Sequence, residues 1–86
     1  MPGSAISRFT AEKEAEYWID KAEENMDEWG VQDIDTLLLA MQEEMGELTQ
    51  AYLEYSAEDG DGERIPKELA DLGALCFQLS WRLEQE

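Results

Sequence analysis

One stretch near the end of the chain constrains the fold more than any other feature of the sequence. Between Leu69 and Trp81 the only polar side chains are Asp71, Gln78 and Ser80, although the chain of 86 residues has a formal net charge of −16. A helix that is apolar on nearly all sides has to be covered on several of them. Two other helices are too few to cover it in a chain of this length. We therefore expect a homo-oligomer, either a dimer or a tetramer, with this helix at its centre.

Apolar residues also recur at helical spacing in the preceding part of the chain. A first helix is expected from Thr10, which can cap its N-terminus, to Gly30, which fits a helix stop. A second helix is expected from Asp33 or Asp35 to about Ser56. The apolar stripe of the first helix is Ala15, Trp18, Ile19, Ala22, Met26 and Trp29, and that of the second is Ile34, Leu37, Leu38, Met41, Met45, Leu48, Tyr52 and Tyr55. Steps of three and four residues place each set on one helix face.

The third helix is expected to start around Ile65–Pro66, since proline is tolerated in a first turn, and to continue to near the C-terminus. The charged segment 57–63, with its two glycines, predicts a loop before it. The chain has no internal repeat and no strand pattern, so the fold class is all-α. We expect a single domain over residues 1–86, in which residues 1–9 form a frayed N-terminal lead.

Composition excludes several classes of function. With 22 acidic and 6 basic side chains, the chain is not expected to bind nucleic acid. It has no histidine and a single cysteine, Cys76, which excludes zinc fingers, Ser–His–Asp triads and an internal disulfide framework. The lone cysteine suits a reducing compartment. Neither a signal segment nor an apolar run of about 20 residues is present, so we expect a cytoplasmic protein without a membrane partner.

The acidic excess has two interpretations. A salt-adapted, halophilic protein uses carboxylates to keep its surface hydrated, and its self-repulsion is screened by salt. An acidic interaction module would instead present the same charge to a partner. The broad spread of the acids and the presence of only three lysines favour the salt-adapted interpretation.

Two pairs of carboxylates differ from the rest by their position around the helix. At about 100° per residue, Glu44 and Glu47 lie about 60° apart at the edge of the second apolar stripe. Glu68 and Asp71 have the same spacing on the third helix. Four carboxylates that converge in a partly buried place need a counter-charge, and oxygen ligands without histidine or cysteine favour Mg²⁺ or Mn²⁺ over zinc. The alternative is that these acids belong to the solvated surface.

The spacing of these acids resembles a known signature. The pattern Glu43-Glu44-x-x-Glu47, a gap of twenty residues and then Glu68-x-x-Asp71 is similar to that of the all-α NTP pyrophosphatase superfamily, and in particular to the MazG-like nucleotide pyrophosphohydrolases. The flanking residues of both halves and a tryptophan before the second helix, Trp29, are also typical of that family. The resemblance covers about residues 10–83.

The resemblance implies antiparallel helices that are completed into four-helix bundles by homo-oligomerisation. It also implies Mg²⁺-dependent hydrolysis of a nucleoside triphosphate or deoxynucleoside triphosphate to the monophosphate and pyrophosphate, an activity compatible with house-cleaning of non-standard nucleotides. Glu44, Glu47, Glu68 and Asp71 would be the metal ligands. Glu43 would join Glu44 and Glu47 in catalysis as an auxiliary acid that supports a metal or orients water.

The same resemblance implies side chains that bind the substrate. Lys67, Arg64 and Arg82 are the candidates for the phosphate tail, whereas Lys13 and Lys21 are expected at the surface. Trp29 is the candidate substrate contact among four aromatic residues that either stack on a base or belong to the core. The other three are Trp18, Tyr52 and Tyr55. The residues expected to be buried as hydrophobes are Cys76, Phe77 and Trp81, the last two in the oligomer interior.

Two alternatives to this activity stay open at the level of sequence. One is phosphoribosyl-ATP pyrophosphohydrolase, which shares the superfamily signature. The other is a non-catalytic acidic helical module that only oligomerises or binds a basic partner. Metal-dependent pyrophosphate release separates the enzymes from the module.

Overall fold

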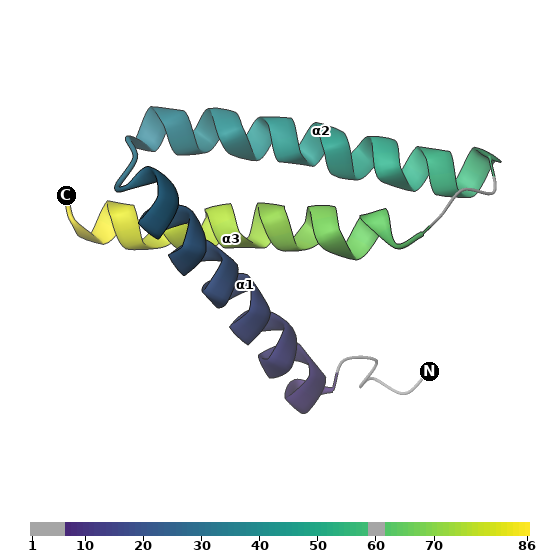
Figure 1. Cartoon of the computed structure of the whole chain (residues 1–86), viewed down its shortest axis with the longest axis horizontal. Coiled ribbons are helices and arrows are strands. Elements are labelled where there is room, and N and C mark those ends of the chain that lie inside the picture. Colours follow the sequence, from purple (N-terminus) through teal and green to yellow (C-terminus); the bar gives the residue numbers. More distant parts are fainter. Residues whose placement is uncertain (1–6, 59–61) are drawn as a thin grey trace.

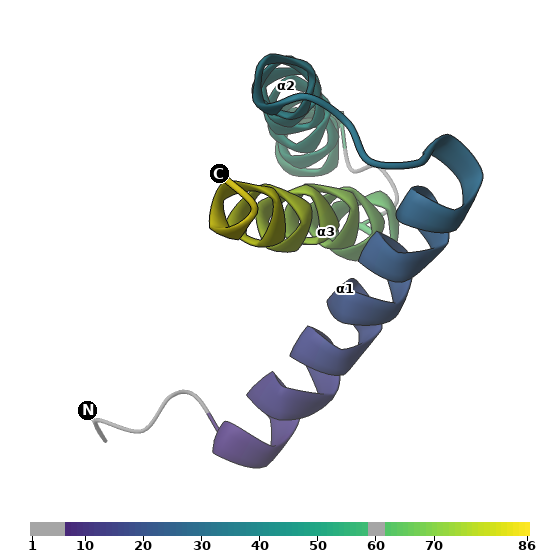
Figure 2. The same cartoon turned by 90° about the vertical axis from the view of Figure 1, so that its left-hand side faces the viewer.

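The computed structural model describes residues 7–58 and 62–86, and within these ranges the chain forms three helices and no strand. They are α1 (Arg8–Trp29), α2 (Ile34–Glu58) and α3 (Arg64–Glu84). Helices α2 and α3 lie side by side and antiparallel, and α1 crosses α3 obliquely (Figure 1). The view turned by 90° shows α1 and α2 on different sides of α3 (Figure 2). The prediction of an all-α chain is confirmed.

The start of α1 differs from the prediction. Ser7, not Thr10, is the N-cap, because the Ser7 hydroxyl accepts a hydrogen bond from the backbone N–H of Thr10 at 3.4 Å. Arg8 and Phe9, which we expected in the frayed lead, therefore belong to the helix. Residues 1–6 lie outside the described residues.

The end of α1 follows the prediction. Gly30 has a φ of 75°, a left-handed conformation that favours glycine, and its N–H donates to the carbonyl of Met26 at 2.8 Å. The next helix starts at Ile34, beside both predicted caps. At its other end α2 extends to Glu58, two residues beyond the predicted end, and residues 59–61 of the predicted loop lie outside the described residues.

Helix α3 is the centre of the molecule. It contacts both α1 and α2, whereas α1 and α2 do not contact each other within the described ranges. Ala70 and Ala74 are completely buried and Gly73 is buried with them, so small side chains let a neighbouring helix approach closely. Cys76 is exposed in the single chain, which corrects our expectation that it is buried. Its position is on the side of α3 that neither neighbouring helix covers.

Two contacts fix α1 on α3. The ring of Trp18 lies directly over Gly73, so closely that a Cβ atom at that glycine would be 2.4 Å from the ring carbon Cε3. Two turns further along α1, the side chain of Asn25 donates a hydrogen bond to Gln78 at 2.9 Å, and Gln78 is only 4% exposed. A buried polar pair of this kind fixes the register of two helices, because breaking it leaves an unsatisfied buried amide. None of the helices in the described part of the chain is long and apolar enough to cross a membrane.

The packing of Trp18 on Gly73 predicts opposite effects for the same substitution at two glycines. Gly73→Ala is expected to lower the free energy of unfolding by about 1–3 kcal/mol, because the added methyl group forces α1 away from α3. Gly46→Ala in the middle of α2 is the control, since a Cβ there meets nothing within 4 Å. It is expected to raise the free energy of unfolding by about 0.5–1 kcal/mol through helix propensity. Urea unfolding followed by circular dichroism measures both, and similar effects of the two variants would contradict the close approach of α1.

Candidate functional site

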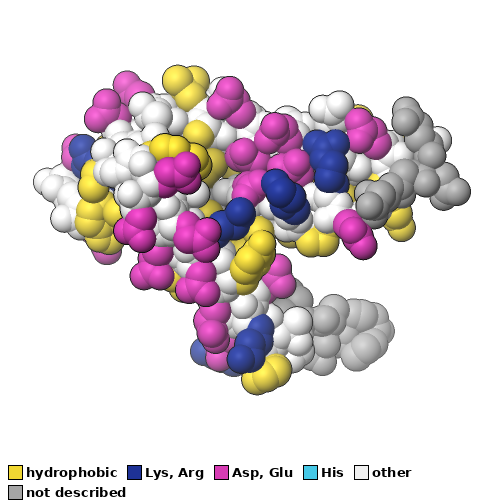
Figure 3. Space-filling view, viewed as in Figure 1, with side chains coloured by type: hydrophobic (Ala, Val, Ile, Leu, Met, Phe, Trp, Pro, Cys, Tyr) yellow, Lys and Arg dark blue, Asp and Glu magenta, His cyan; other side chains and the backbone are white. Residues whose placement is uncertain are grey.

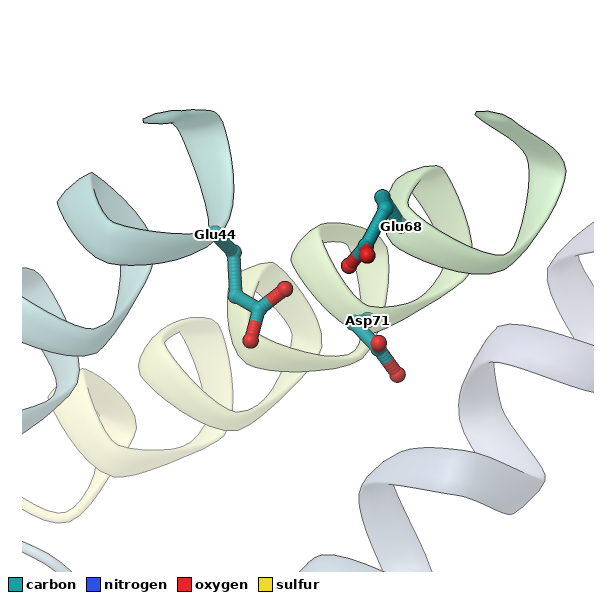
Figure 4. Close-up of side chains that lie close together, drawn as sticks. All are labelled: Glu44, Glu68 and Asp71. Atoms are coloured by element: carbon teal, nitrogen blue, oxygen red, sulfur yellow. The ribbon is translucent and has the colours of Figure 1, made fainter. Parts of the chain in front are cut away.

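Three carboxylates from two helices converge at the contact between α2 and α3. Glu44 projects from α2 toward the turn of α3 that carries Glu68 and Asp71 (Figure 4). One carboxylate oxygen from each residue lies within 4.8 Å of the other two. Glu68 is buried, with 7% of its surface exposed, and the other two are half-buried. Three oxygens at this separation can hold one cation between them.

The position of the cluster follows from the apolar stripes of the helices. Leu37 and Ala51 of α2 are buried, with 1% and 2% of their surfaces exposed, and they define the side of α2 that faces α3. Glu44 lies between them, two turns after Leu37 and two turns before Ala51, and so points at α3. On α3, Glu68 and Asp71 are one turn apart, which places both carboxylates beside Glu44.

Of the three converging carboxylates, that of Glu44 is the least compensated. Its Oε2 atom is buried and has no hydrogen-bond partner among the described residues, and it forms no salt bridge with any of them. The pKa of Glu44 is raised from 4.5 to about 7, first by burial, then by hydrogen bonding with Glu47, and further by repulsion from the carboxylates of Glu47, Asp71 and Glu68. A cation bound here would give the buried oxygen the partner that it lacks and would reduce the repulsion among the neighbouring carboxylates.

Asp71 is compensated by two lysines that come from different helices. The Nζ atom of Lys21 in α1 lies 2.9 Å from Oδ1, and the Nζ atom of Lys67 in α3 lies 3.4 Å from Oδ2. The two ammonium groups differ in burial, because the side chain of Lys21 is 26% exposed and that of Lys67 is 64% exposed. The Asp71 carboxylate raises the pKa of Lys21 through its hydrogen bond and its charge.

Glu68 is compensated by an arginine. Arg64 donates from Nη2 to the Glu68 carboxylate at 3.3 Å and from Nη1 to Glu54 at 3.0 Å. Three of the chain's six basic side chains thus gather around three carboxylates, and the space-filling view shows basic side chains among acidic ones over α2 and α3 (Figure 3). Half of the basic side chains of the sequence therefore lie at this one group of carboxylates.

Lys21 and Glu54 are the members of this network that sequence reasoning missed. Lys21 was expected at the surface because it lies in a helix rich in acids. A signal was present, since Lys21 follows Trp18 by three residues and precedes Ala22, so it borders the apolar stripe of α1. Only the crossing of α1 over α3 shows that this edge meets Asp71.

The remaining predicted acids lie beside the cluster and not within it. Glu47 is exposed and influences Glu44, but it does not belong to the group of three converging carboxylates. Glu43 is exposed and faces the cleft that Glu44 also lines. The structure therefore brings together three of the four predicted ligands, with Glu47 one helical turn away on α2.

The predicted substrate contacts divide in the same way. Arg64 and Lys67 reach the carboxylates, as described above. Arg82 does not, because it lies eleven residues after Asp71, about 16 Å along the helix, and pairs with Glu86. Trp29 is 57% exposed and lines the cleft next to the cluster, so it is neither a core residue nor a contact of the carboxylates.

A cleft of about 1030 Å³ opens from the carboxylates between α1 and α2, with α3 as its floor. The charged side chains that line it are Lys21, Glu24, Glu28, Glu43, Glu44 and Asp71. Uncharged polar side chains also line it, namely Asn25, Gln32, Thr36 and Gln42, and the apolar ones are Trp29, Leu39, Ala40 and Leu75. Its volume is at the upper end of that of small-molecule sites, so it has room for a nucleotide-sized ligand.

The donor set suits a hard divalent cation. The converging ligands are oxygens alone, and the described residues include no histidine that would favour a softer metal. The partnerless Glu44 oxygen is the observation that favours a cation most directly. No protein-family model, no curated protein and no solved structure matches this chain, so the site has to be interpreted from its own geometry.

The raised pKa of Glu44 predicts a pH dependence of stability. Between pH 4.5 and about 7 the folded protein retains a proton on Glu44 that the unfolded chain has released, so the contribution of Glu44 to stability falls as the pH rises through this interval. Glu44→Gln removes this contribution. As the pH rises, the wild type is therefore expected to lose stability relative to Glu44→Gln, as measured by their free energies of unfolding.

Urea unfolding at constant ionic strength across that interval measures the difference. Glu43→Gln is the matched control, since it removes the same charge at the adjacent, exposed position. A pH-independent difference for Glu44→Gln, or an equal trend for Glu43→Gln, would show that Glu44 titrates normally.

Proposed function

We propose that this protein is a Mg²⁺-dependent pyrophosphohydrolase that cleaves a nucleoside triphosphate or deoxynucleoside triphosphate to the monophosphate and pyrophosphate. Mn²⁺ is the other metal that suits the ligands. The observation that carries the proposal is the convergence of the Glu44, Glu68 and Asp71 carboxylates beside a nucleotide-sized cleft. One of the Glu44 oxygens, Oε2, is buried there without a hydrogen-bond partner among the described residues. The resemblance of the acidic spacing to MazG-like enzymes adds to it.

In this proposal Glu44, Glu68 and Asp71 hold the metal, with Glu47 as a further ligand from the next turn of α2. When bound, Mg²⁺ supplies neutralisation of the triphosphate charge and lowers the pKa of a coordinated water. Glu43 lines the cleft beside the cluster, where it can accept a proton from the attacking water. Arg64 and Lys67 are the nearby cations for the phosphate groups.

Pyrophosphate release from a panel of nucleotides tests the activity. The panel contains the common and modified nucleoside triphosphates, their deoxy forms and phosphoribosyl-ATP, with Mg²⁺ or Mn²⁺ in a buffer of high KCl. We expect release from at least one nucleotide, and we expect Asp71→Asn and Glu44→Gln to reduce it by about 100-fold or more while the helical circular dichroism signal persists. Each substitution removes a ligand's charge with little change in volume.

Glu16→Gln serves as the control, because Glu16 is an exposed acid of α1 outside the cluster and the cleft. Its activity should equal that of the wild type. If the folded wild-type protein releases no pyrophosphate from any member of the panel with either metal, the proposed activity is wrong.

A homo-oligomer is the second part of the proposal, and two lines of exposed side chains support it. Leu38, Met45 and Tyr52 recur at seven-residue intervals along α2 and are 44%, 52% and 56% exposed. Along α3 the line is Leu69, Cys76 and Leu83, with the same interval, and all three are exposed. Seven-residue apolar lines are typical of helices that pack against further helices in a bundle. Neither line contributes to the cleft, so a second copy can cover them and complete a four-helix bundle without closing the site.

Sedimentation equilibrium tests the oligomer. The chain has a mass of 9.8 kDa, and the wild type is expected to sediment at twice or four times that mass in high KCl. Leu69→Glu places a charge in the α3 line and is expected to give the monomer mass, because a buried unpaired charge is costly. Val31→Glu is the control, since Val31 is also an exposed apolar residue, at 62% against 39% for Leu69, but lies between α1 and α2 outside both lines. A monomeric wild type would contradict this part of the proposal and leave the activity to be judged by its own assay.

A non-catalytic helical module is the alternative that a specific observation favours. Asp71 already has two ammonium partners and Glu68 has a guanidinium partner, so these carboxylates are compensated without a metal. The module leaves the Glu44 oxygen without a partner, however, and it gives the cleft no role. For this reason we prefer the enzyme.

A further inference from the structure

We propose that Lys21 is an exchangeable counter-ion. It neutralises Asp71 while the site is free of metal, and it turns to the phosphate groups of the substrate once a divalent cation takes its place at the carboxylate. This inference rests on the proposed function, because it concerns the metal and the triphosphate of that same site. It assigns to Lys21 a positioning role that couples the binding of the two.

The geometry places Lys21 in competition with a metal. Its ammonium group is 2.9 Å from Oδ1 of Asp71, and both side chains are largely covered, at 26% and 21% exposed. A cation shared by Glu44, Glu68 and Asp71 needs a carboxylate oxygen of Asp71, and both of these oxygens already have an ammonium partner, Lys21 at Oδ1 and Lys67 at Oδ2. Two positive charges at that separation in a partly buried site repel each other, so occupation by one favours departure of the other.

The cleft gives the displaced lysine a destination. Lys21 is the only basic side chain among the described residues that line the cleft, and five of these residues are acidic. A triphosphate that enters the cleft without a metal therefore meets net negative charge. With a metal on the carboxylates, the negative charge is reduced and the Lys21 ammonium is free to donate to a phosphate oxygen.

Lys21 is better suited to this exchange than Lys67. Lys67 lies on the same helix as Asp71, is 64% exposed and is absent from the lining of the cleft. Its pairing with Asp71 at four residues' distance along one helix is a common surface interaction of small energy. Lys21 belongs to α1 and reaches across to α3, so it both pairs with Asp71 and lines the cleft.

Competition and assistance by the same side chain predict effects of opposite sign. Lys21→Met removes the competitor for Asp71, so Mn²⁺ alone should bind about two- to tenfold more tightly than in the wild type. The same variant lacks the cation that the cleft offers to phosphate, so inorganic pyrophosphate at saturating Mg²⁺ should bind about tenfold more weakly. If Lys21 only held α1 against α3, its loss would weaken the binding of both Mn²⁺ and pyrophosphate.

The matched control is Lys13→Met. It makes the same substitution in the same helix and changes the net charge equally, but Lys13 lies over the ring of Phe9 at 5.5 Å and does not touch Asp71. Mn²⁺ binding is measured by the loss of the free-ion electron paramagnetic resonance signal, and pyrophosphate binding by calorimetry, at one KCl concentration for all variants. Lys21→Arg keeps the positive charge and should restore most of the pyrophosphate affinity.

The outcomes separate the inference from the function on which it rests. If the wild type binds no Mn²⁺, both are overturned. If it binds Mn²⁺ but Lys21→Met binds it no more tightly than Lys13→Met does, the counter-ion exchange is wrong and the metal site stands. Weaker pyrophosphate binding by Lys13→Met to the same extent would also overturn the exchange.

A second measurement uses the wild type alone and so does not depend on the folding of a variant. The chain has only three lysines, Lys13, Lys21 and Lys67, which mass spectrometry can follow separately. Mg²⁺ is expected to raise the rate at which acetic anhydride modifies Lys21, because the ammonium group leaves Asp71, and to leave the rate at Lys13 unchanged. An unchanged rate at Lys21 in the presence of bound Mg²⁺ would overturn the inference.

Discussion

The scarcity of positive charge governs this molecule. A chain with 22 acidic and 6 basic side chains has few cations to place, and half of them surround one group of carboxylates at the contact of α2 and α3. Acids that are spread over a surface can be hydrated and screened by salt. Acids brought together in a partly buried place need cations at short range, because neither water nor salt reaches them fully. The distribution of Lys21, Lys67 and Arg64 therefore marks the place in the fold where electrostatic cost is greatest.

The helix packing decides which cations reach that place. Lys67 and Arg64 are supplied by α3 itself, within one turn of the carboxylates that they contact. Lys21 arrives only because α1 crosses α3 where Gly73 admits the ring of Trp18, and because Asn25 and Gln78 fix the register. The lack of a side chain at Gly73 thus allows a lysine of another helix to reach Asp71, two residues away on α3. Without that close approach the edge of α1 that carries Lys21 would stand away from Asp71.

Periodicity and turn chemistry were sufficient to predict the three helices, the stop at Gly30 and the positions of Glu44, Glu68 and Asp71 at the edges of the apolar stripes. These features depend on neighbours within one or two turns of the same helix. Ser7 as the N-cap was missed because Thr10 offers the same chemistry three residues later. Lys21 was missed for a different reason: its partner belongs to another helix, and a crossing angle is not encoded in the pattern of one helix. Arg82 was assigned to the site by its helical face, but its distance along α3 separates it from Asp71.

Glu44 separates the enzyme from a helical module in physical terms. In a module the ion pairs of Asp71 and Glu68 would be sufficient, and an uncharged glutamine at position 44 would avoid the cost of an ionised carboxylate there. The glutamate present has a pKa raised to about 7 by burial and by its acidic neighbours, so near neutral pH its ionised form opposes folding. Groups that destabilise a fold in their charged form gather at sites where that charge is used. A divalent cation is the partner that would convert this cost into binding energy, because it is attracted most by Glu44, the member of the carboxylate cluster that no lysine or arginine of the described chain neutralises.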